Sequence, residues 1–139
     1  MQEGVASMAQ EPKLKIDGSP VLKVLSVSYT LEAGTDRDGR PTRLLMFGGI
    51  RIRRIGDDKT TLSNWAKDPK ERNRKGGEVE FFTDDGKSMK KLTWKNGYVT
   101  SYDFRYNPQA DHVEEEAVVQ AEEVKCGGLE FKGNWADKS

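Results

Sequence analysis

The sequence predicts a mostly β, antiparallel fold with one short α-helix. Four dipeptides that tolerate the positive φ angles of tight hairpin turns punctuate the chain: Asp17-Gly18, Asp38-Gly39, Asp85-Gly86 and Asn96-Gly97. The segments between them alternate with the period of two that is typical of strands. The length of 139 residues suits one domain. We expect a flexible N-terminal arm at residues 1–12 and a single domain at 13–139.

The first strands expected are residues 21–31 and 50–55. Residues 21–31 carry apolar side chains on both faces, which predicts that this strand is covered on both sides at its start. In "IRIRRI", Ile50 and Ile52 face opposite to Arg51 and Arg53. The preceding Gly48-Gly49 pair is interpreted as a bulge or a close approach of two backbones.

One helix is expected near residues 61–67. Leu62 and Trp65 are spaced to lie on one apolar stripe of a helix. A threonine side chain, from Thr60 or Thr61, is expected to cap its first turn.

Three later segments are also interpreted as strands. Residues 78–82 and 92–94 each place apolar side chains on one face. Residues 98–106 are expected to present one aromatic face, made of Tyr98, Tyr102, Phe104 and Tyr106. The acidic run at 113–125 is interpreted as a strand, because its β-branched valines favour one although Ala and Glu favour helix.

The formal net charge is zero, but the charges are unevenly distributed along the chain. Residues 13–75 hold 15 Lys/Arg against 8 Asp/Glu, and residues 76–139 hold 8 against 13. Either the two halves pair within one fold, or the surface has a positive and a negative side suited to head-to-tail self-association. No basic cluster is joined to exposed aromatic residues, so nucleic-acid binding is not expected. No run approaches the roughly 20 apolar residues of a membrane helix, so no membrane insertion is expected.

No catalytic, metal-binding or cofactor-binding residues are predicted. Cys126 and His112 are the single cysteine and histidine, which excludes an intrachain disulfide and a two-histidine site. We expect Cys126 to be a buried or partly buried free thiol. Trp65 and Trp94 are interpreted as core residues, whereas Trp135 fits the core and a subunit seam equally well.

The order of these segments resembles one known family. "VLSVSYTLEAGTDRDGRPT" is followed by "GG" and "IRIRRI", then by "LSNWA", by "GGEVEFFTDDGKSMKKLTWKNGYVTSYDF" and by a terminal "NWAD". In this order they are similar to the haemolysin-coregulated proteins, the tube subunits of type VI secretion systems. They are most similar to the branch called TssD, which is found in Bacteroidetes. The resemblance covers residues 13–137.

The resemblance implies an antiparallel β-barrel or two-sheet sandwich with one short α-helix, and a structural protein rather than an enzyme. Six copies would form a ring, rings would stack into a tube, and a contracting sheath would expel the tube. The implied partners are further copies of the chain, sheath, spike and baseplate proteins, and effector proteins in the lumen. The N-terminus lacks the features of a secretory signal, so assembly in the cytoplasm and release through the injection machine are expected.

Two alternatives remain open at this point. One is a tube protein of another contractile injection system. The other is a monomeric β-barrel that binds a small apolar ligand on the aromatic face of residues 98–106.

A charged loop is the predicted contact with a neighbouring copy, most simply in the next ring. It lacks an apolar anchor, yet its turn and proline set its geometry. The predicted contact residues are Thr35, Asp36, Arg37, Asp38, Gly39, Arg40, Pro41, Thr42 and Arg43. Trp135 is the second candidate for a subunit contact.

Overall fold

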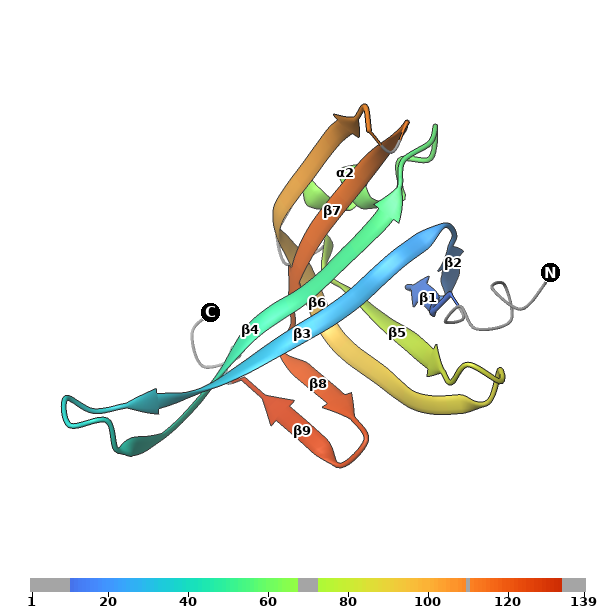
Figure 1. Ribbon diagram of the computed structural model, residues 1–139. Helices are drawn as coiled ribbons and strands as arrows, with labels where there is room; N and C mark the ends of the chain where they lie inside the picture. The colour runs from blue at the N-terminus through green and yellow to red at the C-terminus, as the bar shows by residue number, and fades with distance from the viewer. Residues whose placement is uncertain (1–10, 68–72, 110, 134–139) are drawn as a thin grey trace.

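The computed structural model describes residues 11–67, 73–109 and 111–133, and over these residues the chain is mostly antiparallel β-sheet (Figure 1). The elements run in the order β1 (Lys13–Ile16), β2 (Ser19–Val21), β3 (Val24–Thr35), β4 (Pro41–Ile55), α2 (Thr61–Ala66), β5 (Lys75–Phe82), β6 (Ser88–Asn107), β7 (His112–Gln120), β8 (Glu123–Cys126) and β9 (Leu129–Lys132). The predicted fold class, mostly β with one short helix, is confirmed.

The strands form two layers that share β6. Their hydrogen-bonded order is β2-β1-β5-β6-β7-β4-β3, and β8 pairs with both β6 and β9. The first half of β6 pairs with β5 and β8, and its second half pairs with β7. Among the described strands, β3 pairs with β4 alone, so no barrel closes through hydrogen bonds. Of the two architectures expected, barrel and two-sheet sandwich, the sandwich describes this arrangement.

Three of the four predicted turns link adjacent strands, but Asn96-Gly97 lies inside β6. Asn96 has a φ of 61°, and it lies where the β5–β6 register shifts, between the pairs Gly77–Trp94 and Lys75–Gly97. A Cβ on Gly97 would lie 2.8 Å from the Trp94 ring and 3.0 Å from the Lys75 carbonyl oxygen. The positive φ is therefore used to bend a strand from one sheet into the other, as in a β-bulge, rather than to reverse the chain.

The Gly48-Gly49 pair forms a bulge, as predicted. Tyr29 pairs with Ile50 and Leu31 pairs with Phe47, so the two glycines lie opposite one residue of β3. Gly49 has a φ of 100°, a conformation that residues with a Cβ rarely adopt.

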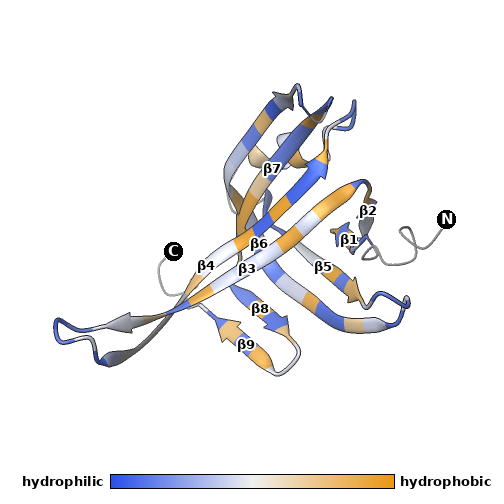
Figure 2. Cartoon of the chain, viewed as in Figure 1, coloured by the Kyte–Doolittle hydropathy of each residue, from blue (hydrophilic) through white to orange (hydrophobic). Residues whose placement is uncertain are grey.

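The core lies between the two layers and under α2. Alternating hydrophobic and hydrophilic residues are visible along β4, β6 and β7 (Figure 2). The predicted inward residues Ile50 and Ile52 are fully buried, as are Trp65 and Trp94, and Cys126 is a buried free thiol. Further core side chains are Leu14, Leu62, Val79, Leu92, Ala117, Val119 and Val124.

The segment 21–31 differs from its prediction. The chain leaves one sheet after Val21 and enters the other at Val24, with Lys23 at a positive φ of 63° between them. Leu22, just before β3, and Leu25, within it, are exposed, so the apolar side chains here are not covered on both sides in the single chain. The acidic run is a strand as predicted, interrupted at 121–122 between β7 and β8.

The helix has the predicted position but not the predicted cap. Thr60 is the N-cap residue, yet its side chain makes no capping hydrogen bond. Its Oγ1 instead accepts a hydrogen bond from Asn64 Nδ2 at 2.9 Å. Burial of Leu62 and Trp65 therefore holds this six-residue helix in place, because a helix this short is not stable by itself. The predicted division at residue 12 stays a prediction, since residues 1–10 lie outside the described part.

We predict that Gly49→Ala destabilises the protein more than Gly86→Ala. Both glycines have positive φ, but a Cβ at Gly86 meets open space, whereas one at Gly49 would lie 2.9 Å from Val118 Cγ1. We expect a loss of about 1 to 2 kcal/mol at Gly86 from backbone conformation alone, and roughly 1 to 3 kcal/mol more at Gly49 from overpacking. Urea unfolding measures both losses. Equal losses would contradict the close packing described for the bulge.

Candidate functional site

The predicted contact loop joins β3 to β4 at the end of a hairpin that projects beyond both sheets (Figure 1). Asp36 Oδ1 accepts hydrogen bonds from the backbone N–H groups of Asp38 and Arg40, each at 2.9 Å. The Asp36 N–H also donates to the Arg40 carbonyl oxygen at 2.9 Å. One aspartate therefore sets the turn within a single chain, through the hydrogen bonding that Asp side chains commonly provide in turns.

The side chains of this loop point into solvent. Residues 35–41 are all exposed, and the end of the hairpin is hydrophilic (Figure 2). Arg40 Nη2 lies 3.9 Å from Asp38 Oδ2, but both side chains are largely exposed, so this contact contributes little to stability. The side chains of Thr42 and Arg43 lie outside the described part of the structure, as does Trp135. The structure thus places the centre of the predicted loop at an exposed, pre-formed tip.

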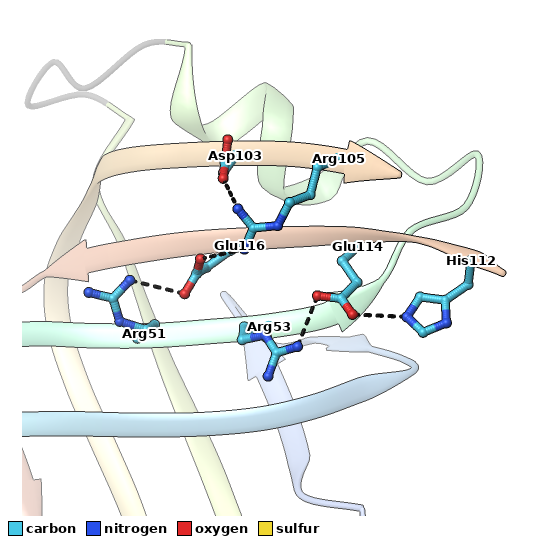
Figure 3. Close-up of polar contacts among 7 residues, drawn as sticks. All are labelled: Arg51, Arg53, Asp103, Arg105, His112, Glu114 and Glu116. Carbon is cyan, nitrogen blue, oxygen red and sulfur yellow. Dashed lines mark hydrogen bonds and ion pairs between the residues drawn. The ribbon is translucent and has the colours of Figure 1, made fainter. Parts of the chain in front are cut away.

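A second polar surface, the charged face, lies on the outer side of β4, β7 and β6 (Figure 3). Glu116 on β7 accepts from Arg51 Nη1 of β4 at 3.0 Å and from Arg105 Nη2 of β6 at 3.2 Å. Arg105 also donates to Asp103. Two arginines from the flanking strands thus bind one central carboxylate, and Arg51 first, then Arg105, holds the pKa of Glu116 below its usual range.

Glu114 makes the neighbouring contacts of the charged face. Its Oε1 accepts from Arg53 Nη2 at 2.9 Å, and its Oε2 lies 3.0 Å from His112 Nε2. The Arg53 guanidinium, with a smaller effect from His112, lowers the pKa of Glu114. Basic residues from the first half of the chain therefore pair with acidic residues from the second half inside one molecule. Of the two explanations for the uneven charge, the structure supports intrachain pairing on this face.

Beneath this face lies a buried ionic network that the sequence analysis missed. Arg54 and Glu115 are only 3% and 2% exposed. Arg54 Nη1 donates to Glu115 Oε1 at 2.6 Å, Nη2 donates to Asp57 Oδ2 at 3.1 Å, and Nε donates to the Leu22 carbonyl oxygen at 2.9 Å. Tyr102 donates to the other Glu115 oxygen. The network joins β4, β7, β6 and two loops at one end of the sandwich.

The network shifts two pKa values. Burial, together with the neighbouring Glu115 carboxylate, raises the pKa of Tyr102 to about 12. The hydrogen bond from Arg54, with the backbone N–H of Lys59, lowers the pKa of Asp57 to about 2. The alternation of the strand could have indicated this network. Arg54 follows Ile50 and Ile52 at the same two-residue spacing, so it lies on the same inward face of β4.

The four aromatic side chains of residues 98–106 do not share one face. A bulge at residue 100 shifts the β6–β7 register, so Tyr98 points opposite to Tyr102. Phe104 and Tyr106 are 54% and 59% exposed near the end of β6. The predicted four-residue aromatic face is therefore wrong for Tyr98, whereas Tyr102, Phe104 and Tyr106 keep the period of two and remain on one face of β6. Among the described residues, no three His, Cys, Asp or Glu side chains are placed to hold one metal ion. No described helix is long and apolar enough to span a membrane.

Comparisons with known proteins agree with this architecture. A family model described as Hemolysin coregulated protein Hcp (TssD) matches residues 8–136. The solved structure of Hcp1 from Flavobacterium johnsoniae is 28% identical, with a TM-score of 0.77 over 89% of this chain and 100% of that one.

More distant structures share the fold. Hcp1 of the E. coli EAEC 042 pathovar is 14% identical, with a TM-score of 0.70 over 91% of this chain and 99% of that one. A chain of the PVC sheath-tube complex, an extracellular contractile injection system, is 16% identical, with a TM-score of 0.55 over 93% and 99%. No curated protein matches significantly.

We predict that Glu115→Gln lowers the free energy of unfolding by roughly 3 kcal/mol, because it leaves the buried Arg54 charge without its nearest counter-charge. The matched control is Glu116→Gln, whose arginine partners are more than half exposed to solvent, at 55% and 52%. There we expect a loss within about 1 kcal/mol. Urea denaturation measures both values. A loss at position 115 no larger than that at 116 would count against the buried network as a stabilising contact.

A pH dependence follows from Asp57. Its pKa is lower in the folded chain than the ordinary value of 3.8, so its contribution to stability is present above about pH 4 and is lost as the pH falls towards 2. Asp57→Asn lacks this titration. We expect the stability gap between the wild type and this variant to narrow between pH 4 and pH 2, measured by urea unfolding at each pH. A gap that stays constant would refute the Arg54–Asp57 assignment.

Proposed function

The chain belongs to the haemolysin-coregulated protein (Hcp, TssD) family of type VI secretion tube proteins, and we propose that its copies form hexameric rings that stack into the inner tube of such a system. The observation that carries this proposal is the match of the family model to residues 8–136. The family is structural rather than enzymatic, and its members form tube assemblies. To this family membership the proposal adds two points for this chain: that six copies form a ring, and that the rings stack.

The contact loop supports stacking through Thr35–Arg43. Its tip is exposed, carries both signs of charge and projects away from the two sheets (Figure 1). Because Asp36 already holds the turn, little backbone order remains to be gained on contact, where fixing a residue costs about 1 to 2 kcal/mol. A pre-formed loop of this kind fits a binding role better than a core role.

The remaining partners follow from the same proposal. The tube would assemble in the cytoplasm and leave through the injection machine, in contact with sheath, spike and baseplate proteins, and it would carry effector proteins in its lumen. The PVC tube-sheath structure supports a tube of another contractile injection system as the second candidate, although at 16% identity it supports the fold alone. Trp135, outside the described residues, remains proposed as a subunit seam.

The experiment replaces both Asp38 and Arg40 with alanine. The Asp36 carboxylate still binds the two backbone N–H groups, so the turn is retained while its charges are removed. We expect rings to persist and the yield of tubes to fall several-fold, as counted by negative-stain electron microscopy and by sedimentation.

The matched control is Asp84→Ala with Lys87→Ala, which removes one acid and one base from the exposed β5–β6 turn. This variant is expected to leave the tube yield unchanged. Tubes at wild-type yield from the Asp38/Arg40 variant would refute stacking through the loop, and a wild-type protein that stays monomeric at high micromolar concentration would refute the ring.

A further inference from the structure

We propose that the contact loop of one copy docks on a defined corner of the next copy, made of Leu22, Lys23, Asp57, Asp58 and Lys59. We call these five residues the acceptor corner. The inference rests on the proposed stacking through the loop and adds the partner surface that receives it. The occupant is a second copy of this chain.

The position of the corner supports a head-to-tail contact. Strand β4 begins at Pro41 beside the contact loop and ends at Ile55, just before the acceptor corner, and β3 runs back along it (Figure 1). Loop and corner therefore lie at opposite ends of one two-stranded ribbon. A contact between two different surfaces at opposite ends of a molecule repeats in one direction, as stacking requires.

The corner is rigid in the single chain. The buried Arg54 guanidinium binds the Leu22 carbonyl oxygen and Asp57, at 2.9 and 3.1 Å. The Ile55 N–H donates to the Lys23 carbonyl oxygen at 2.9 Å, and Lys23 Nζ lies 3.4 Å from Asp57 Oδ2. Two loops from different parts of the sequence are thereby fixed to each other. A surface that is already ordered loses less entropy on binding.

The hollow at the corner itself is small. Leu22 is 62% exposed and borders a hollow of about 100 Å³ that Asp57 and Lys59 also line, and another of about 370 Å³ on the side of β1. Sites for small molecules usually measure about 300 to 1,000 Å³. The smaller hollow, which the corner residues line, is below that range and accommodates one small side chain beside an exposed leucine, as a docked loop would provide.

Charged side chains without an ion pair, on both the loop and the corner, support a second copy of the chain as the partner. Among the described residues, Arg37 of the loop and Asp58 and Lys59 of the corner have exposed side chains that form no ion pair or hydrogen bond. The other acid of the corner, Asp57, is engaged, because it binds Arg54 and Lys23. Asp58 is therefore the acid of the acceptor corner that is left for an incoming cation.

The order of the charges is complementary as well. The loop reads basic then acidic at Arg37-Asp38, and the corner reads acidic then basic at Asp58-Lys59. Asp38 is only weakly engaged by Arg40 at 3.9 Å, so it is available to Lys59. Two opposite pairs give the contact a preferred register without net repulsion.

Reciprocal charge reversal tests the pairing. The variants are Arg37→Asp, Asp58→Arg and the double variant with both changes, examined for rings and for tubes at fixed salt. One exposed ion pair between two copies changes their association constant by up to about fivefold. Because every subunit of a ring makes the same contact with the next ring, the effects of these ion pairs combine. We therefore expect each single reversal to raise the critical concentration for tubes at least about tenfold. The double variant should return to within about threefold of the wild type, since exposed pairs rarely recover fully.

The control is Arg37→Asp combined with Asp84→Arg, which restores the net charge at a different hairpin. It should stay as defective as Arg37→Asp alone, because the lost partner is not replaced. Single reversals that leave tubes unaffected, or a double variant no better than its parents, would overturn the acceptor corner while the proposed function stands. A wild type without rings or tubes would overturn the proposed function, and the inference with it.

Discussion

The continuity of β6 is the constraint on which the rest of the structure depends. One 20-residue strand hydrogen-bonds to β5 and β8 along its first half and to β7 along its second half. The bend at Asn96-Gly97 therefore sets how the two sheets face each other, and the core fills the space between them. The Asn96 side chain reinforces the bend by donating to Glu122 at 2.8 Å, just before β8 begins. A hairpin at this point would have separated the layers instead of joining them.

The fold was predictable where the period of two was unbroken. The alternation of β4 correctly placed Ile50 and Ile52 inside and Arg51 outside. The prediction failed at the bulge at residue 100, because one extra residue reverses the faces that follow and leaves no pattern of its own. The prediction of a hairpin turn at Asn96-Gly97 was wrong for a related reason. Turns and bulges both require positive φ, so the dipeptide alone does not separate them.

The candidate site was predictable to a smaller extent. The charged tip followed from local composition, because its turn depends on Asp36 and its immediate neighbours. The buried network did not, because Arg54 and Glu115 lie 61 residues apart and meet only through the β4–β7 register. A prediction of core positions from hydrophobic side chains expects no charged residue there, so it overlooks a buried ion pair. The acceptor corner was equally hidden, since it combines two loops from different parts of the chain.

The turn at the hairpin tip separates the residue that sets the backbone from the residues that we propose for recognition. Asp36 alone supplies the side chain that holds the backbone there, and the exposed side chains of Arg37, Asp38 and Arg40 form no hydrogen bond or ion pair with the body of the protein that the structure describes. Those positions are free to vary without any cost in core packing. Under the proposed stacking through the loop, where one genome encodes several such chains, a few changes at the tip would let each copy assemble with copies of itself, although all of them share the same fold.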